Sequence, residues 1–175
     1  MFNKFKLSVS FLFLTLICIS CYAQKAVEVK EKVKLTKLKD SVTVYRDAYS
    51  VPYIEAKNDY DLYFAQGFEM AKDRMWQMDL YRRVARGQLS ELFGERVFDE
   101  DKRWRQFGFS EIAEKSYEIT SPELKEALNA YSDGVNAYLA TLDKNSMPIE
   151  FQILQYQPDE WKPTDTIVVG KILAD

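Results

Sequence analysis

The stretch DLYFAQGFEMAKDRMWQMDLYRR, residues 61–83, decides the fold because it forms the centre of a long helical pattern. A cap at Asn58 or Asp59 starts this pattern, which continues to about Arg86. At 1.5 Å per residue, the predicted helix is about 40 Å long. Its apolar residues recur at spacings that predict one buried stripe: Leu62, Ala65, Phe68, Met75 and Met78.

Glycines mark two points of this helix. Gly67 lies inside it, where glycine costs about 1 kcal/mol relative to alanine, so we expect another backbone to approach closely there. Gly87 fits the helix end. Leu89 to Phe93 then predict one further helical turn before Gly94.

Two short strands precede the helix. Residues 42–46 and 51–56 alternate apolar with polar side chains, and residues 47–50 between them are typical of a turn. This pattern predicts a β-hairpin. Pro52 has no amide proton, so it belongs at a strand start or on an edge.

Two further helices are predicted downstream. One begins with Ser121 as its cap and Pro122 at its first position. The other begins at Thr164 or Asp165, and its apolar residues continue to Ala174 without a stop signal. We therefore expect the sequence to end inside an element. The fold class is α+β, a hairpin followed mostly by helices.

The N-terminus resembles an export signal. Residues 1–23 combine two early lysines with an apolar run that is short for a permanent membrane span of about 20 residues. Cleavage after Ala23 is favoured over lipoprotein processing at Cys21. The predicted organisation is a signal peptide at 1–23, an extension at 24–41 and one partial domain at 42–175. An exported, periplasmic protein is expected.

The charge argues against nucleic-acid binding. Removing residues 1–23 takes away two lysines and no acid, so the formal net charge moves from −3 to −5. Nucleic-acid binders normally carry a basic face. The lysine-rich stretch at residues 32–39 is short and alternating, which is typical of a solvated strand or tether.

No catalytic or metal-binding residue is predicted within the chain itself. It has no histidine, and both cysteines lie in the signal segment, which removes the usual zinc ligands and the base of a serine triad. The DEDK run at 99–102 lacks the pattern of a calcium loop and is interpreted as a solvated turn. The many carboxylates and arginines of the long helix are interpreted as ion pairs, and the aromatic residues as core.

Six motifs in order resemble the start of the penicillin acylase family of N-terminal-nucleophile hydrolases. They are VYRDAYSVPYIEA, FAQGFEMAKDRMWQMDLYRRVARGQLSELFG, RQFG, YSDGVNAYL, PIEFQIL and EWKPTD. The chain departs from the family pattern at Ser50, where glycine is common, and at Tyr53, where histidine is common. These departures put the tightness of the hairpin turn in question.

The resemblance implies a precursor cut into an α chain and a β chain, of which this chain is the N-terminal part of the α chain. It also implies a serine nucleophile at the first position of the β chain, whose own α-amino group is the base. Such an amine, with a pKa of about 8, needs no histidine. The implied fold has four layers, αββα, and this chain is expected to be an incomplete piece of it.

The same resemblance implies the remaining site assignments. Ile172 and Leu173 are expected in the wall of the acyl pocket, with packing on the β chain as the equal alternative. No catalytic or metal residue is assigned here, and calcium in the complete protein is expected to bind residues outside this chain. Without the β chain, we expect exposed apolar faces at Leu62, Met75, Leu128 and Ile167.

The sequence therefore predicts part of the α subunit of a secreted amidohydrolase acting on a linear amide between an acyl group and an amine. Its expected partners are a β chain from the same precursor and a small acyl amide, with no nucleic acid. This piece alone is expected to be inactive. One alternative is a non-catalytic, secreted helical binding module from a truncated gene. Another is a carboxylate-pair hydrolase complete within this chain.

Overall fold

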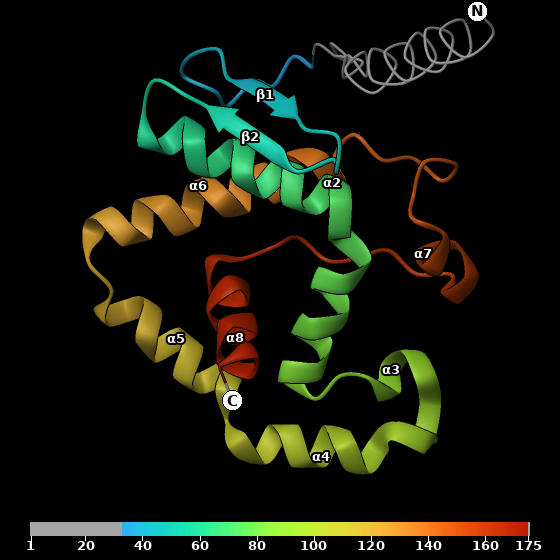
Figure 1. The fold of residues 1–175 in the computed structure, drawn as a ribbon. Helices are drawn as coiled ribbons and strands as arrows, with labels where there is room; N and C mark the ends of the chain where they lie inside the picture. Colours follow the sequence, from blue (N-terminus) through green and yellow to red (C-terminus); the bar gives the residue numbers. More distant parts are fainter. Residues whose placement is uncertain (1–32, 175) are drawn as a thin grey trace, which may run out of the picture.

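The computed structural model describes residues 33–174 and has the predicted α+β architecture. The predicted signal peptide and most of the extension lie outside the described residues. A two-stranded hairpin packs beside the long helix α2, and the later helices surround α2 (Figure 1). The elements are β1 (Thr43–Arg46), β2 (Pro52–Glu55), α2 (Asp59–Arg86), α3 (Ser90–Phe93), the 3-10 turn η1 (Gly94–Val97), α4 (Phe98–Phe107), α5 (Phe109–Ile119), α6 (Pro122–Leu139), α7 (Ile149–Leu154) and α8 (Pro163–Leu173).

The hairpin is antiparallel, with Tyr45 opposite Tyr53 and Val44 opposite Ile54. The carboxylate of Asp47 accepts hydrogen bonds from the amides of Tyr49 and Val51, at 2.8 and 2.9 Å. This closes the turn. Ser50 has φ +63°, in the left-handed region that favours glycine, so serine adopts here the backbone conformation that a glycine at this position would allow.

Helix α2 has the predicted start and end. Asn58 Oδ1 accepts from the amide of Asp61 at 2.9 Å, and Gly87 ends the helix with φ +60°. The buried carboxylate of Asp61 in turn accepts from the amides of Lys39 and Asp40, at 2.9 and 2.8 Å. The start of α2 therefore also fixes the segment before the hairpin.

The predicted bounds of α2 are confirmed, but its length is not that of a straight helix of about 40 Å, because α2 is kinked. Arg74 has φ −143° and ψ +24°, a pair of backbone angles far from those of an α-helix. Figure 1 shows the two parts of α2 running in different directions. Neither proline nor glycine stands at the kink, so the residue types that normally mark a bend are missing from the sequence there.

The N-terminal part of α2 crosses α6 at very close range. A Cβ added to Gly67 would lie 2.1 Å from the carbonyl oxygen of Tyr131, and one added to Gly134 would lie 1.9 Å from that of Phe64. The predicted backbone approach at Gly67 is confirmed. Its counterpart on α6 is a second glycine that the sequence pattern did not single out.

The larger of two buried apolar clusters in residues 33–174 lies between α2, α6 and the chain around α7. Met75 is only 2% exposed, because Phe151 and Trp161 belong to the same cluster. The expectation that Met75 is exposed is therefore wrong. Leu128 and Ile167 are half-buried, and among the four expected apolar positions only Leu62 is exposed.

Two other local predictions need correction. The DEDK run is the first turn of α4, where Asp101 is 2% exposed and accepts from the amides of Leu89 and Ser90 at 2.8 and 2.7 Å. It is a buried helix-capping group instead of a solvated turn. Helix α8 begins at Pro163, and Asp165 stands inside its first turn, where its carboxylate accepts from the Lys162 amide at 2.8 Å.

Candidate functional site

A buried charge network joins the C-terminal part of α2 to the start of α8. At its centre is Arg82, which is 3% exposed. Its guanidinium contacts Asp79 on α2 and donates to Asp165 on α8 at 3.2 Å. It also donates to the backbone carbonyls of Glu160 and Asp159, at 3.1 and 3.2 Å. One side chain thus holds two helices and the segment that leads into α8.

The carboxylate of Asp79 is surrounded by donors. Arg83 Nε lies 3.0 Å and the Tyr156 hydroxyl 2.7 Å from its Oδ2 atom. Burial alone raises the pKa of Asp79, but the Arg82 charge and the hydrogen bonds outweigh it, so the pKa is below its ordinary value. Burial, then the bond to Asp79, raises the pKa of Tyr156. Both groups keep their ordinary protonation near neutral pH, so the network positions helices instead of transferring protons.

Asp165 is the second anion of the network and is fully buried. One of its oxygens accepts from Arg82 and from the Lys162 amide. The other pairs with the guanidinium of Arg86. These contacts confirm the interpretation of the α2 arginines as ion-pairing groups. The sequence could have indicated a capping role for Asp165, because it is the third residue of a helix that begins with proline.

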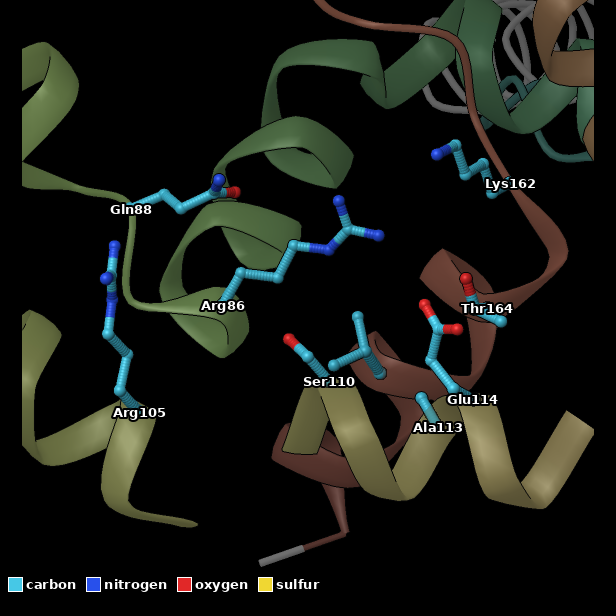
Figure 2. A pocket seen from close by; sticks show the side chains of 9 residues that line it. Arg86, Gln88, Arg105, Ser110, Ala113, Glu114, Lys162 and Thr164 are labelled. Carbon is cyan, nitrogen blue, oxygen red and sulfur yellow. The ribbon is translucent and has the colours of Figure 1, made fainter. Parts of the chain in front are cut away.

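A polar cavity of about 470 Å³, the α5–α8 pocket, lies next to this network. Figure 2 shows Arg86 extending across it, with Gln88 and Arg105 to one side and Lys162, Thr164 and Glu114 to the other. Arg105 Nε also donates to the carbonyl of Gly87 at 2.8 Å, which fixes α4 to the end of α2. The pocket is lined by Arg86, Gln88, Arg105, Ser110, Ala113, Glu114, Lys162, Thr164 and Val168.

A second, larger cavity of about 1170 Å³, the hairpin groove, lies between the hairpin, α2 and the start of α7. Arg46 is one of its lining residues and pairs with Glu69 and, at 3.0 Å, with Asp73. The groove combines these charges with exposed apolar side chains such as Met70 and Val51. It is an open surface of mixed polar and apolar character.

The two residues predicted to line an acyl pocket lie near the end of α8. Ile172 is half-buried and packs on a small cluster that contains Ala85, Ala113 and Val168. Leu173 is 66% exposed. Successive helical residues point about 100° apart, so the two side chains face different surroundings. Neither lines either of the two cavities, and the pocket-wall role stays a prediction.

The described residues do not fit a calcium site. Calcium takes six to eight oxygen ligands, and residues 33–174 contain no group of three acidic side chains placed to hold a metal ion. The acids are instead used individually, as helix caps and ion-pair partners. None of the helices in this part of the chain is long and apolar enough to cross a membrane.

The fold and sequence are similar to those of known acylases. Residues 41–175 match the family model of penicillin amidase. The chain is 37% identical over 133 residues to penicillin acylase 2 proenzyme of Pseudomonas sp. (strain SE83), covering 76% of this chain and 17% of that protein. It is 35% identical over 136 residues to acyl-homoserine lactone acylase QuiP of Pseudomonas fluorescens (strain Pf0-1), covering 78% of this chain and 16% of that protein.

A solved structure agrees with these relatives. Thermostable penicillin G acylase from Alcaligenes faecalis superposes with a TM-score of 0.68 at 29% identity, covering 74% of this chain and 69% of that chain. This chain spans about a sixth of the length of the curated relatives that it matches. On the match of residues 41–175 and on this likeness of fold, the chain belongs to the penicillin amidase family.

Proposed function

We propose that this chain is the N-terminal part of the α subunit of an exported amidohydrolase, which hydrolyses a linear amide between an acyl group and an amine. The observation that carries the proposal is the family match over residues 41–175. The relatives are named as acylases of penicillin and of acyl-homoserine lactones. Both are acyl amides, and this shared chemistry defines the substrate class proposed here.

In this proposal the described residues act as scaffold. Three buried carboxylates are already committed to structural contacts. Asp61 accepts from the amides of Lys39 and Asp40, Asp79 pairs with Arg82, and Asp165 accepts from the Lys162 amide. The nucleophile and its base would then come from the β chain of the same precursor, as a serine with a free α-amino group. Such an amine accepts a proton near neutral pH and can activate the hydroxyl.

The scaffold would also set where an acyl group can bind. Arg82 and Arg86 hold α8 against α2 through Asp165. Ile172 and Leu173 lie at the end of the same helix, 7 and 8 residues beyond Asp165. A shift of α8 would move both side chains. We propose them as candidates for the apolar wall, with no metal assigned to residues 33–174.

Expression of the complete reading frame tests this function. The expected results are N-terminal sequencing that finds a large processed chain beginning with serine, and hydrolysis of at least one of phenylacetyl, glutaryl and long-chain acyl amides. Replacing that serine by alanine should abolish both processing and hydrolysis. An intact precursor without amide hydrolysis would remove the enzyme assignment and favour a secreted binding module.

Export can be tested separately. Cleavage after Ala23 predicts a mature protein that begins at Gln24 and is recovered in the periplasmic fraction. Lipoprotein processing predicts instead a chain that begins at Cys21 and carries lipid. Mass spectrometry of the mature N-terminus distinguishes the two.

A further inference from the structure

We propose that the α5–α8 pocket binds a small oxyanion, a carboxylate or phosphate group. This site is separate from the acyl amide chemistry proposed above. Its volume, about 470 Å³, is within the usual range of small-molecule sites. Its lining is dominated by polar and cationic side chains, with Ala113 and Val168 as the apolar members. That composition favours a charged ligand over an acyl chain.

Three cations from different elements line the pocket: Arg86 from α2, Arg105 from α4 and Lys162 from the segment before α8. Glu114 is the one acid in the lining. Within residues 33–174, neither Arg105 nor Lys162 forms a salt bridge, although the Arg105 charge also acts on Asp101. Guanidinium groups are well suited to carboxylate and phosphate, because they present several donors in one plane.

Arg86 adds an unpaired donor to the lining. One of its terminal nitrogens pairs with Asp165, whereas its buried Nε atom and the buried Oδ1 atom of Asp165 have no hydrogen-bond partner among the described residues. A buried donor without an acceptor is destabilising. An oxyanion in the pocket that Arg86 lines could accept from this group.

Two helices also begin at the pocket. Ser110 lies in the first turn of α5, whose start has no side-chain cap, and Thr164 lies in the first turn of α8, whose start is already capped by the Asp165 carboxylate. First-turn amides lack intrahelical acceptors, and the N-terminal end of a helix attracts anions. The hydroxyls of Ser110 and Thr164 add two donors. The uncapped start of α5 and the three cations therefore indicate the same class of ligand, and the unpaired Nε atom of Arg86 adds a further donor.

Calorimetric titration of the protein expressed from its complete reading frame tests this site. The probes are inorganic phosphate and acetate, each against chloride at equal ionic strength. We expect saturable binding of at least one probe. The Lys162→Gln variant should bind about tenfold more weakly, because one charge-assisted contact is lost. The Glu114→Gln variant should bind more tightly, because the one repelling carboxylate is removed.

The Lys144→Gln variant is the matched control, since it removes the same charge from an exposed lysine that does not line the pocket. Its affinity should equal that of the unchanged protein. Saturable binding of acetate identifies a carboxylate site and binding of phosphate a phosphate site. Absence of saturable binding by both probes overturns the proposal, as does an equal loss in the Lys162 and Lys144 variants. Amide hydrolysis is not the readout, so either result is independent of the proposed enzyme function.

Discussion

The two parts of α2, on either side of the kink at Arg74, are held in place by different forces. The N-terminal part crosses α6 through backbone contact at Gly67 and Gly134, with Phe64 and Phe68 buried beside it. The C-terminal part is anchored to α8 by Asp79, Arg82 and Asp165, all at most 3% exposed. Close packing thus fixes one part and paired buried charges fix the other, which implies different sensitivities to mutation and pH.

The largest expected effect comes from breaking the charge network. The Arg82→Met variant leaves the carboxylates of Asp79 and Asp165 buried without their shared partner. Removing one member of a buried pair costs about 3 to 5 kcal/mol. Urea unfolding should show this loss of stability. The Arg96→Met variant removes an exposed arginine from the η1 turn and should stay within about 0.5 kcal/mol of the unchanged protein. Equal losses in both variants would contradict the role of the buried network.

Crowding the helix crossing should have the next largest effect. In the Gly134→Ala variant, the new Cβ would lie 1.9 Å from a backbone oxygen, so α2 and α6 must move apart. Overpacking of this kind costs about 1 to 3 kcal/mol. The matched change Gly170→Ala meets nothing within 4 Å on α8 and should instead stabilise, by about 1 kcal/mol or less. Thermal unfolding of the two variants should therefore shift in opposite directions.

Acid should weaken the anchoring of the C-terminal part of α2, because it protonates Asp79. The pKa of its carboxylate is lowered in the folded protein from the ordinary value of 3.8, so the folded state binds this proton less readily than the unfolded chain. The contribution of Asp79 to stability is complete above about pH 4 and is lost as pH falls through the lower folded value. Unfolding free energies measured between pH 6 and pH 3 should fall.

The Asp79→Asn variant should be less stable at pH 6 and should lose less stability on acidification, because one titrating carboxylate has gone. The carboxylates of Asp61 and Asp101, whose pKa values are also lowered, remain and keep part of the slope. An unchanged slope in the Asp79→Asn variant would show that the network does not titrate as described.

The smallest effect is expected at the hairpin, outside both parts of α2. Ser50 holds φ +63° at a cost of about 1 kcal/mol relative to glycine. The Ser50→Gly variant should therefore raise the unfolding free energy by about 1 kcal/mol or less. A stability decrease would mean that chain entropy outweighs the strain. The unfolding free energies of Ser50→Gly and Gly134→Ala should be measured together, because the two changes are expected to have opposite signs.

The packing of the N-terminal part of α2 was largely predictable from sequence. The charge network that anchors its C-terminal part was not. Helix periodicity and the rule for interior glycines predicted α2 and the close approach at Gly67. The same periodicity cannot identify which distant acid pairs with Arg82, because Asp165 lies 83 residues away. Met75 was expected to be exposed for a similar reason, since its cover comes from Phe151 and Trp161.

The candidate site illustrates the same limit. Arg86, Arg105 and Lys162 have no sequence spacing in common, and they line one pocket only because α4, α5 and α8 meet the end of α2. The sequence around Arg74 has no proline or glycine that would predict the kink. Asp101 lies in an acidic run that predicted a turn. The amides that it binds belong to Leu89 and Ser90 at the start of α3, which the run itself does not reveal.

The glycine crossing has a consequence for how this chain can change in length. Gly67 faces the carbonyl of Tyr131, three residues before Gly134, and Gly134 faces the carbonyl of Phe64, three residues before Gly67. The contact between the two helices is therefore reciprocal. One inserted residue would rotate the following part of either helix by about 100° and move its glycine out of the contact. A scan of single-residue insertions should therefore find an intolerant block in α2 around Gly67 and a second one in α6 around Gly134.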